Sequence, residues 1–292
     1  MIIVNIIGGL GNQMFQYAAG RALSIARNEI LLLDIGDFSG YGLHQGFELQ
    51  RLFDCSIHIA SRQAIKSVLG WQAYPLLKRG LTRQYGSIFR KSCFVIEPYF
   101  EYWSGFRDLS NNVYLQGYWQ SERYFENIAD VIRGDFVFKL PMNAINIDVS
   151  EKIASVNSVS LHIRRGDYVS NPVNLTIHGL CRLDYYQSAI DLIVSKVSQP
   201  HFFVFSDDIV WAKTNLKFDF AVDYISHNVG TESYNDMRLM SLCQHHIIAN
   251  SSFSWWGAWL NQNPNKIVIA PKRWFVVSKN ISDLLPDSWI VL

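Results

Sequence analysis

Short apolar runs alternate with amphipathic stretches in the first part of the chain. An apolar run at residues 2–7 predicts a buried strand, and the glycine-rich residues 8–11 predict the turn that follows it. Asn12 can cap a helix whose apolar positions recur over 14–26, and residues 30–33 predict the next strand. This order predicts a βαβ unit, the module of parallel α/β folds.

The second half of the chain repeats the order strand, polar turn, helix. Strands are predicted over 159–163, 202–205, 246–249 and 267–270, and helices over 184–197, over 236–244 and from Ser251 or Ser252. In the first half, residues 40–110 predict no definite element, 113–119 predict a short strand that runs into a loop, and a helix is predicted from Ser121. The weak pattern near 141–147 predicts a boundary between a domain at 1–145 and a domain at 146–292.

The composition fits a protein with a sizeable core. The 292 residues are 49% hydrophobic with a formal net charge of +1, which argues against nucleic acid as a partner. Aromatic residues make up 14% of the chain, and they either line a site for ring-shaped ligands or fill the core. The four cysteines are widely spaced, which predicts free thiols in a reducing compartment. No signal peptide or membrane-spanning segment is predicted, so we expect a cytoplasmic protein.

Polar residues follow three of the predicted strands. Arg164-Arg165-Gly166-Asp167 follows one strand, Ser206-Asp207-Asp208 follows a second, and Asn250-Ser251-Ser252 follows a third and opens a helix. In open α/β sheets, ligands bind beyond the carboxyl ends of the strands. A helix start and an arginine both bind phosphate well, so these turns predict a diphosphate site that needs no metal. The alternatives are arginines paired with carboxylates, such as Arg165 with Asp167, and ordinary helix caps.

Two other kinds of chemistry are disfavoured by the sequence. No Asp-x-Asp pair occurs, and His245-His246 lack the spacing of a zinc-binding helix, so we predict no catalytic metal. Gly9-x-Gly11 imitates the start of a dinucleotide-binding fingerprint, but Met14 stands where the third glycine belongs. A nicotinamide-dependent oxidoreductase is therefore a remote alternative.

Several motifs together resemble one known family. They are GGLGNQMFQYAAGRAL at 8–23, LQGYWQSERYF at 115–125, LHIRRGDY at 161–168, FSDD at 205–208 and ANSSFSWWGAWL at 249–260. In order and spacing, this set is similar to the α-1,2-fucosyltransferases of glycosyltransferase family 11, over nearly the whole chain.

The resemblance implies a fold, a reaction and its substrates. It implies a GT-B-like α/β architecture, with two Rossmann-like halves facing across a cleft, an acceptor-side domain at 1–145 and a GDP-fucose-binding domain at 146–292. It implies GDP-β-L-fucose as donor and the 2-hydroxyl group of a terminal galactoside as acceptor. The anomeric centre inverts in one displacement, and no metal or other cofactor is expected.

The resemblance also implies roles for individual residues. In the H-x-R-R-x-D motif at 162–167, Arg164 is expected to contact the β-phosphate of the donor, and strand alternation places His162 on the same face. Arg165 is then expected to point away from the donor and to have a structural role, with Asp167 as a candidate partner. Either Asp207 or Asp208 is expected to accept hydrogen bonds from guanine. The remaining residues expected at the donor are Gly9, Gly11, Asn12, Asn250, Ser251, Ser252 and Phe253, with Asn12 near the reacting sugar.

The general base and the acceptor site are less defined. A residue must accept the proton of the attacking hydroxyl group, and His162, Glu48 and Asp167 are the candidates. The acceptor is expected against Tyr99, Tyr118 or Trp119, for which core packing is the alternative role, and Glu48 is also expected to bind it.

We therefore predict an inverting, metal-independent α-1,2-fucosyltransferase of bacterial type. It would act in O-antigen or other surface-glycan synthesis, on a galactose-terminated and lipid-linked oligosaccharide, with peripheral contact to the inner membrane. The alternatives are a transferase that makes a different deoxysugar linkage and a sugar-binding protein without catalysis.

Overall fold

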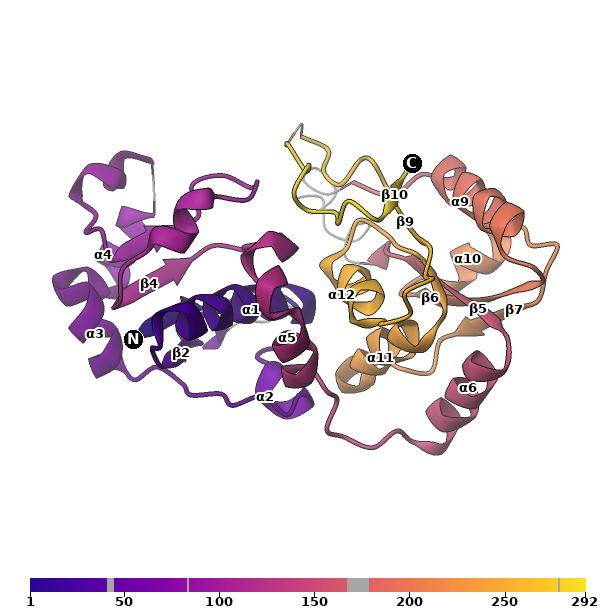
Figure 1. Ribbon diagram of the computed structural model, residues 1–292, viewed down its shortest axis with the longest axis horizontal. Coiled ribbons are helices and arrows are strands. Elements are labelled where there is room, and N and C mark those ends of the chain that lie inside the picture. The colour runs from indigo at the N-terminus through magenta and orange to yellow at the C-terminus, as the bar shows by residue number, and fades with distance from the viewer. Residues whose placement is uncertain (41–44, 83, 167–178, 278) are drawn as a thin grey trace. The chain divides into compact units, whose positions relative to one another are not determined.

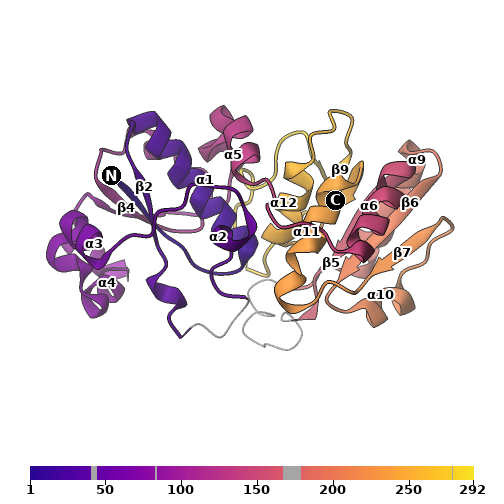
Figure 2. The same cartoon turned by 90° about the horizontal axis from the view of Figure 1, so that it is seen from below.

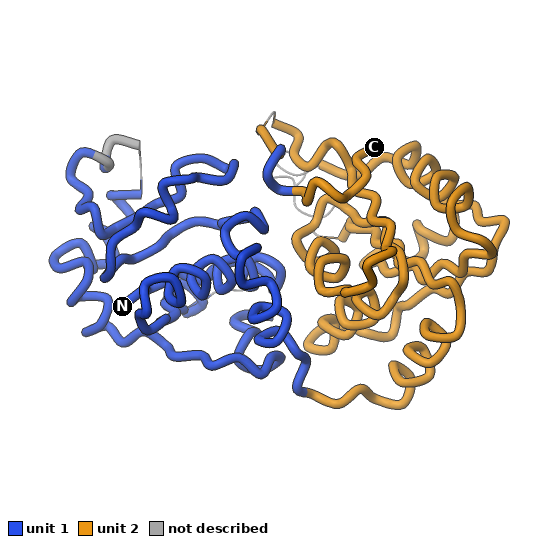
Figure 3. Tube along the Cα trace, in the orientation of Figure 1, with its two compact units in different colours: residues 1–139, 282–284 blue, residues 140–281, 285–292 orange. Residues whose placement is uncertain are grey.

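The computed structural model describes residues 1–40, 45–82, 84–166, 179–277 and 279–292, and only the backbone of residues 84, 85 and 87. The chain forms two units, Met1–Lys139 with Ser282–Leu284 and Leu140–Ile281 with Leu285–Leu292 (Figure 3). The division lies a few residues before the predicted boundary at 145/146, because helix α6 (Ala144–Ser155) packs against elements of the second unit. The functional roles predicted for the two domains stay predictions.

Unit 1 contains a parallel sheet with the strand order β2-β1-β4-β3. Its strands are β1 (Ile2–Asn5), β2 (Leu31–Asp34), β3 (Phe94–Ile96) and β4 (Val113–Gln116). Helix α1 (Leu10–Arg27) connects β1 to β2, as the sequence predicts for a βαβ unit (Figure 1). Gly20 allows α1 to lie close to the sheet, because a Cβ at this residue would be 2.3 Å from Cγ2 of Val4.

Helix α1 begins earlier than the sequence predicted, with Gly9 as its N-cap residue. The expected cap role of Asn12 was therefore wrong, because the turn is completed by Gly8 in a left-handed conformation with φ of +80°. The side chain of Asn12 serves another contact, since its Oδ1 accepts a hydrogen bond from Nε2 of Gln120 at 2.7 Å.

The long segment between β2 and β4 consists of short elements. They are the 3₁₀ turn η1 (Gly36–Phe38), α2 (Leu49–Leu52), α3 (Arg62–Leu69), η2 (Gly70–Ala73), α4 (Pro75–Leu81), η3 (Gln84–Phe89), β3 and η4 (Ser104–Asp108). Apolar residues of α3 and α4 cover the sheet, with Val68, Leu69 and Leu81 packed against Phe94 and Tyr114. Elements of one or two turns carry too few positions to show a periodic pattern, which is why the sequence predicted none here.

After β4, the single helix predicted from Ser121 is replaced by three short pieces. They are η5 (Glu122–Tyr124), η6 (Glu126–Ile128) and α5 (Ala129–Asp135). Ser121 does cap the first of them, because its side chain accepts a hydrogen bond from the amide of Arg123. The residues Ser282–Leu284 complete unit 1 through Asp283, whose carboxylate pairs with Nη1 of Arg123 at 2.6 Å and accepts from the amide of Tyr102 at 3.1 Å.

Unit 2 contains a second parallel sheet with the order β10-β9-β8-β5-β6-β7. Its strands are β5 (Asn157–Ile163), β6 (Pro200–Ser206), β7 (Val222–Ile225), β8 (His245–Ile247), β9 (Val268–Ala270) and β10 (Ile290–Val291). Its helices include α6, α9 (Leu183–Lys196), α10 (Ile209–Asn215), α11 (Tyr234–Leu242) and α12 (Ser252–Leu260) (Figure 2). The 3₁₀ turn η7 (Gly230–Glu232) precedes α11.

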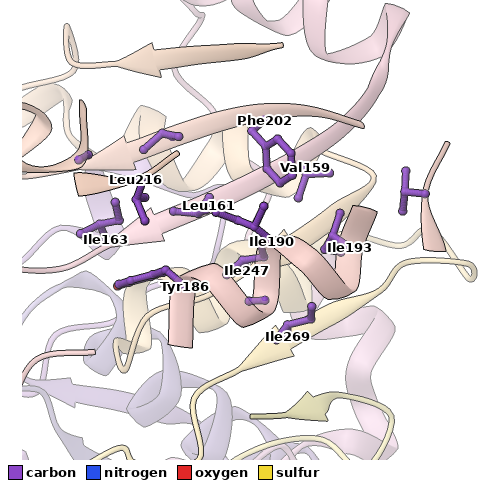
Figure 4. Packing of buried hydrophobic residues seen from close by; sticks show 14 residues of the cluster. Val159, Leu161, Ile163, Tyr186, Ile190, Ile193, Phe202, Leu216, Ile247 and Ile269 are labelled. Atoms are coloured by element: carbon purple, nitrogen blue, oxygen red, sulfur yellow. The ribbon is translucent and has the colours of Figure 1, made fainter. Parts of the chain in front are cut away.

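The alternation of side chains along β5 separates two apolar layers of unit 2. On one face, Leu161 and Ile163 belong to the same buried cluster as Ile190 and Ile193 of α9 (Figure 4). On the other face, aromatic residues of β6 pack against Leu239 and Met240 of α11. His162 therefore belongs to the face opposite α9.

Candidate functional site

Three polar turns lie at one edge of the sheet in unit 2. Strands β6 and β8 are the two neighbours of β5, and all three run parallel, so their carboxyl ends meet at the same edge. Arg164 and Arg165 follow β5, Asp207 and Asp208 follow β6, and the segment after β8 leads into α12. The structure thus brings together residues that the sequence places more than 40 positions apart, since Arg164 and Asp207 form an ion pair.

Asp207 holds the turn after β5 in place. Its Oδ2 lies 2.9 Å from Nη1 of Arg164, and its Oδ1 accepts a hydrogen bond from the amide of Arg165 at 2.8 Å. Gly166 makes room for this carboxylate, because a Cβ there would lie 2.9 Å from Oδ2 of Asp207. The side chains of Arg164 and Asp207 keep 28% and 25% of their surface exposed, so a ligand can reach the guanidinium group.

Arg165 and Asp208 form a second pair that is structural. Nε of Arg165 lies 3.2 Å from Oδ2 of Asp208, and the guanidinium group stacks 4.2 Å from the ring centre of Trp211. The other oxygen of Asp208 caps α10 by accepting from the amide of Trp211 at 3.0 Å. This geometry supports the structural role predicted for Arg165, with Asp208 as its partner. Asp207 and Asp208 both accept hydrogen bonds from within the chain. A guanine base would therefore have to bind the remaining lone pairs of their carboxylate oxygens.

His162 lies beside the start of α12. Its ring centre is 5.9 Å from that of Phe253, and only 6% of the residue is exposed. Its buried Nδ1 has no hydrogen-bond partner among the described atoms, so a ligand donor could pair with it. Burial lowers the pKa of His162 to about 3, although Asp207 acts in the opposite direction. An imidazole with this pKa is a weak proton acceptor, which favours positioning of the donor over a role as general base.

The residues at and before the start of α12 have different roles. Ser251 is the N-cap residue, and its side chain accepts from the amide of Phe253 at 3.3 Å. Ser252 and Phe253 are partly exposed in the first turn. Asn250 is buried, and its amide group donates to the carbonyl oxygen of Trp274 at 3.1 Å, so this side chain fixes the loop before the helix. Asp167, the last residue of the motif at 162–167, lies outside the described residues.

In unit 1, two buried glutamines of α1 organise the loops after β1, β2 and β4. Nε2 of Gln13 donates to the carbonyl oxygens of Gly8 at 2.9 Å and Gly46 at 2.7 Å, while its Oε1 accepts from the amide of Glu48 at 2.9 Å. Gln16 accepts from the amide of Ile7 and donates to a carbonyl oxygen after β4. Sequence reasoning missed both residues, although amides spaced three apart on an apolar helix face are a usable signal.

Glu48, one of the three candidates for the general base, is only 4% exposed. Burial raises its pKa, while Arg51, with Nη2 3.2 Å from the carboxylate, lowers it. The net rise moves Glu48 towards the pH range in which a general base works best. Of the two candidate bases that the structure describes, Glu48 therefore has a pKa better suited to accepting a proton than that of His162.

The two predicted acceptor residues after β4 differ in exposure. Tyr118 is 42% exposed, whereas Trp119 is fully buried and packs against Phe106 with ring centres 5.1 Å apart. Glu97 shapes this loop, because its carboxylate accepts from the amides of Tyr118 at 2.7 Å and Trp119 at 2.9 Å. Trp119 thus favours the core-packing alternative, and Tyr118 and Tyr99, which is 50% exposed, are the residues able to touch a sugar.

Asp236, in the first turn of α11, makes stability depend on pH. Burial raises its pKa to about 7, although a hydrogen bond from Nδ2 of Asn228 at 2.9 Å lowers it. The unfolded pKa is about 3.9, so the folded chain binds the extra proton, and we expect this residue to reduce stability as pH rises from about 4 to about 7. Asp236→Asn should remove on the order of 3 kcal/mol of that dependence, measured as the difference in the free energy of urea unfolding between pH 4 and pH 7. An unchanged pH dependence would contradict the assignment, and the exposed Asp219→Asn serves as control.

No group of three or more His, Cys, Asp or Glu that could hold a metal occurs among the described residues. The two neighbouring histidines do not form one, since His246 is buried between Ser160 and Asn261, with Nδ1 2.8 Å from the hydroxyl group and Nε2 2.7 Å from the amide nitrogen. Within the same ranges, no helix has the length and apolar character needed to cross a bilayer. The expected independence from metal stays a prediction.

The fold is that of known glycosyltransferases. A crystal structure of NodZ α-1,6-fucosyltransferase soaked with GDP-fucose superimposes with a TM-score of 0.56 at 14% identity, covering 89% of this chain and 92% of that one. A structure of NodZ from Bradyrhizobium gives a TM-score of 0.54 at 13% identity, covering 88% and 91%. The parallel sheets and these likenesses confirm the predicted GT-B-like α/β fold class.

Sequence comparison gives the family. Residues 93–289 match the family described as glycosyl transferase family 11. The chain is 39% identical over 296 residues to an α-1,2-colitosyltransferase of Escherichia coli, covering 99% of this chain and 98% of the relative. It is 33% identical over 304 residues to the O-antigen biosynthesis glycosyltransferase WbnK of Escherichia coli, covering 98% of each. The chain therefore belongs to glycosyl transferase family 11 and is a glycosyltransferase, which confirms the resemblance.

Proposed function

We propose that this chain transfers L-fucose, or a closely related deoxysugar, from its β-linked GDP donor to the 2-hydroxyl group of a terminal galactoside during O-antigen synthesis. One observation carries the proposal. Arg164 and Asp207 pair at the ends of β5 and β6, and on the same strand His162 contacts Phe253 in the first turn of α12. A guanidinium group and a helix start thus lie at one sheet edge, which suits a diphosphate.

The proposed chemistry consists of charge stabilisation at the leaving group. As the bond to the sugar breaks, negative charge develops on the β-phosphate, and Arg164 and the amides at the start of α12 bind that charge. Each charge-assisted hydrogen bond contributes about 1.5–3 kcal/mol. Donor and product have opposite anomeric configurations, so a single displacement inverts the centre. Glu48 is our candidate to accept the proton from the acceptor hydroxyl group.

The identity of the sugar is the finer part of the proposal. One relative is named an α-1,2-colitosyltransferase, while galactoside α-(1,2)-fucosyltransferase 2 of the rat is 24% identical over 89% of this chain. Colitose is L-fucose without its 3-hydroxyl group, so the two donors differ by one polar group. A site that hydrogen-bonds this group would reject colitose strongly, whereas a site that only encloses the sugar would accept both. Both names carry the same α-1,2 linkage, which supports that part of the proposal.

Donor selection is the experiment that tests the function. Thermal unfolding with GDP, UDP, ADP or NAD should show stabilisation by GDP alone, by about 2.7 kcal/mol at one hundred times Kd, with or without EDTA. Turnover with GDP-fucose and GDP-colitose on a β-galactoside, followed by linkage analysis of the product, should give an α-1,2 bond. Stabilisation by UDP or NAD, or dependence on a divalent metal, would overturn the proposal. Binding of GDP without turnover of either donor would instead favour a sugar-binding protein.

A further inference from the structure

Six exposed apolar side chains lie within residues 71–89 of unit 1. They are Trp71, Tyr74, Leu76, Leu77, Ile88 and Phe89, with exposed fractions of 48%, 58%, 86%, 46%, 85% and 70%. They belong to η2, α4 and η3 and to the residue between η2 and α4. Large apolar groups exposed together mark a surface that contacts a partner or a membrane.

These side chains lie on the outside of a folded segment. The inner residues of α3 and α4 are buried against the sheet, and these helices lie next to each other at the edge of unit 1 (Figures 1 and 2). Gln72 joins the parts, since its Nε2 donates to the carbonyl oxygen of Phe89 at 2.7 Å and its Oε1 accepts from the amide of Lys91 at 3.2 Å. The exposed apolar groups therefore belong to a folded segment, and their exposure does not result from local unfolding.

The charge of the segment has a single sign. Residues 55–96 contain seven Lys or Arg and no Asp or Glu, although the whole chain has 26 basic and 25 acidic residues. One of the seven, Lys78, forms an ion pair with Asp34. The exposed ones that the structure describes are Arg62, Lys66, Arg79 and Lys91. We call these four residues and the six apolar ones the α3–α4 surface.

We propose that the α3–α4 surface binds an anionic lipid bilayer. Basic groups are attracted to the negative surface of such a bilayer, while Trp and Tyr suit its interface and Leu, Ile and Phe enter the acyl region. A protein partner would need a complementary shape, whereas side chains that are up to 86% exposed can enter a fluid bilayer without one. The surface would bring the enzyme to lipid-linked acceptors, whichever sugar it transfers.

Vesicle binding tests this proposal on the full chain. We expect co-sedimentation with phosphatidylcholine vesicles that contain about 30 mol% phosphatidylglycerol, weaker binding as salt rises, and little binding to pure phosphatidylcholine. The double variant Leu76→Glu, Ile88→Glu should lower partitioning by about tenfold or more. The double variant Arg79→Glu, Lys91→Glu should also reduce it, and only for the anionic vesicles. Val210→Glu is the matched control, because Val210 is 74% exposed on α10 of unit 2.

Three outcomes would overturn the proposal. The first is equal partitioning of the wild type and the Leu76→Glu, Ile88→Glu variant, and the second is no binding of the wild type to anionic vesicles. The third is light scattering that shows wild-type dimers and variant monomers without lipid, because the surface would then bind a second copy of the chain. Circular dichroism and the melting temperature of each variant separate lost binding from lost folding. Activity on a short soluble galactoside should stay unchanged, so the test is independent of the proposed reaction.

Discussion

Replacing Arg164 by lysine is expected to lower kcat/KM for sugar transfer by about 10²- to 10³-fold while leaving the fold intact. Lysine keeps the charge but loses the planar fork that binds two phosphate oxygens, and it cannot reproduce the 2.9 Å contact to Asp207 in the same geometry. Because the interaction grows as charge develops on the leaving diphosphate, most of the loss should occur in kcat. Steady-state kinetics with saturating acceptor measures it.

The neighbouring arginine provides the matched control. Arg165 stacks on Trp211 and pairs with Asp208, so Arg165→Lys should lower the melting temperature but reduce turnover far less than Arg164→Lys. Full activity of the Arg164→Lys variant would exclude the phosphate role. Equal losses of activity in both variants, together with equal losses of stability, would mean that the turn acts only through folding.

Replacing Asp34 by alanine is expected to lower the free energy of unfolding by about 3–5 kcal/mol. Oδ2 of Asp34 accepts from Nζ of Lys78 at 3.0 Å and from the hydroxyl group of Tyr114 at 2.5 Å, and Oδ1 accepts from the amide of Gly36 at 3.0 Å. The side chains of Asp34 and Lys78 are only 7% and 18% exposed, so the variant leaves an ammonium group with little solvent around it. Urea unfolding at pH 7 measures the change.

The pH dependence of Asp34 gives an independent check. Burial raises the pKa of this carboxyl group, but Lys78, Tyr114 and Gly36 lower it, and the net shift is downward. Its stabilising contribution is therefore present above the unfolded pKa of about 3.9 and is lost as pH falls through the folded value.

Glu126→Ala is the control for Asp34→Ala, because Glu126 and Arg107 are 51% and 61% exposed and their pair should contribute less than about 1 kcal/mol. Similar losses in both variants would contradict the expectation.

The sequence predicted two kinds of feature well. These are the long elements with a clear hydrophobic period and the polar turns at the ends of parallel strands. The βαβ unit, β5, β6 and helices α9 and α12 all follow from runs long enough to show their period. The gathering of polar turns followed from a rule about parallel strands, so it needed no knowledge of side-chain contacts. The pairing within the turns did not follow, because Arg165 had a sequence neighbour in Asp167 and only the fold brings Asp208 to it.

Other features were missed because several short interactions decide them together. The position of Asn12 suggested a cap, but the left-handed turn at Gly8 starts α1 sooner. Strand β7 was missed because it is at the sheet edge and includes the polar Asp223. Gln13 and Gln16 hold loops after three strands, and their spacing on the apolar face of α1 indicates buried amides, but only the fold shows which loops they bind.

The segment Ser282–Leu284 gives unit 1 a part that is encoded almost at the end of the chain. A single genetic crossover near codon 140, joining the first unit of one relative to the second unit of another, would separate Arg123 from its own Asp283. Hybrids would keep the pair only if both parents carry compatible residues at these positions. A hybrid without an acidic residue at position 283 is therefore expected to leave Arg123 and the amide of Tyr102 without this carboxylate, although both belong to unit 1.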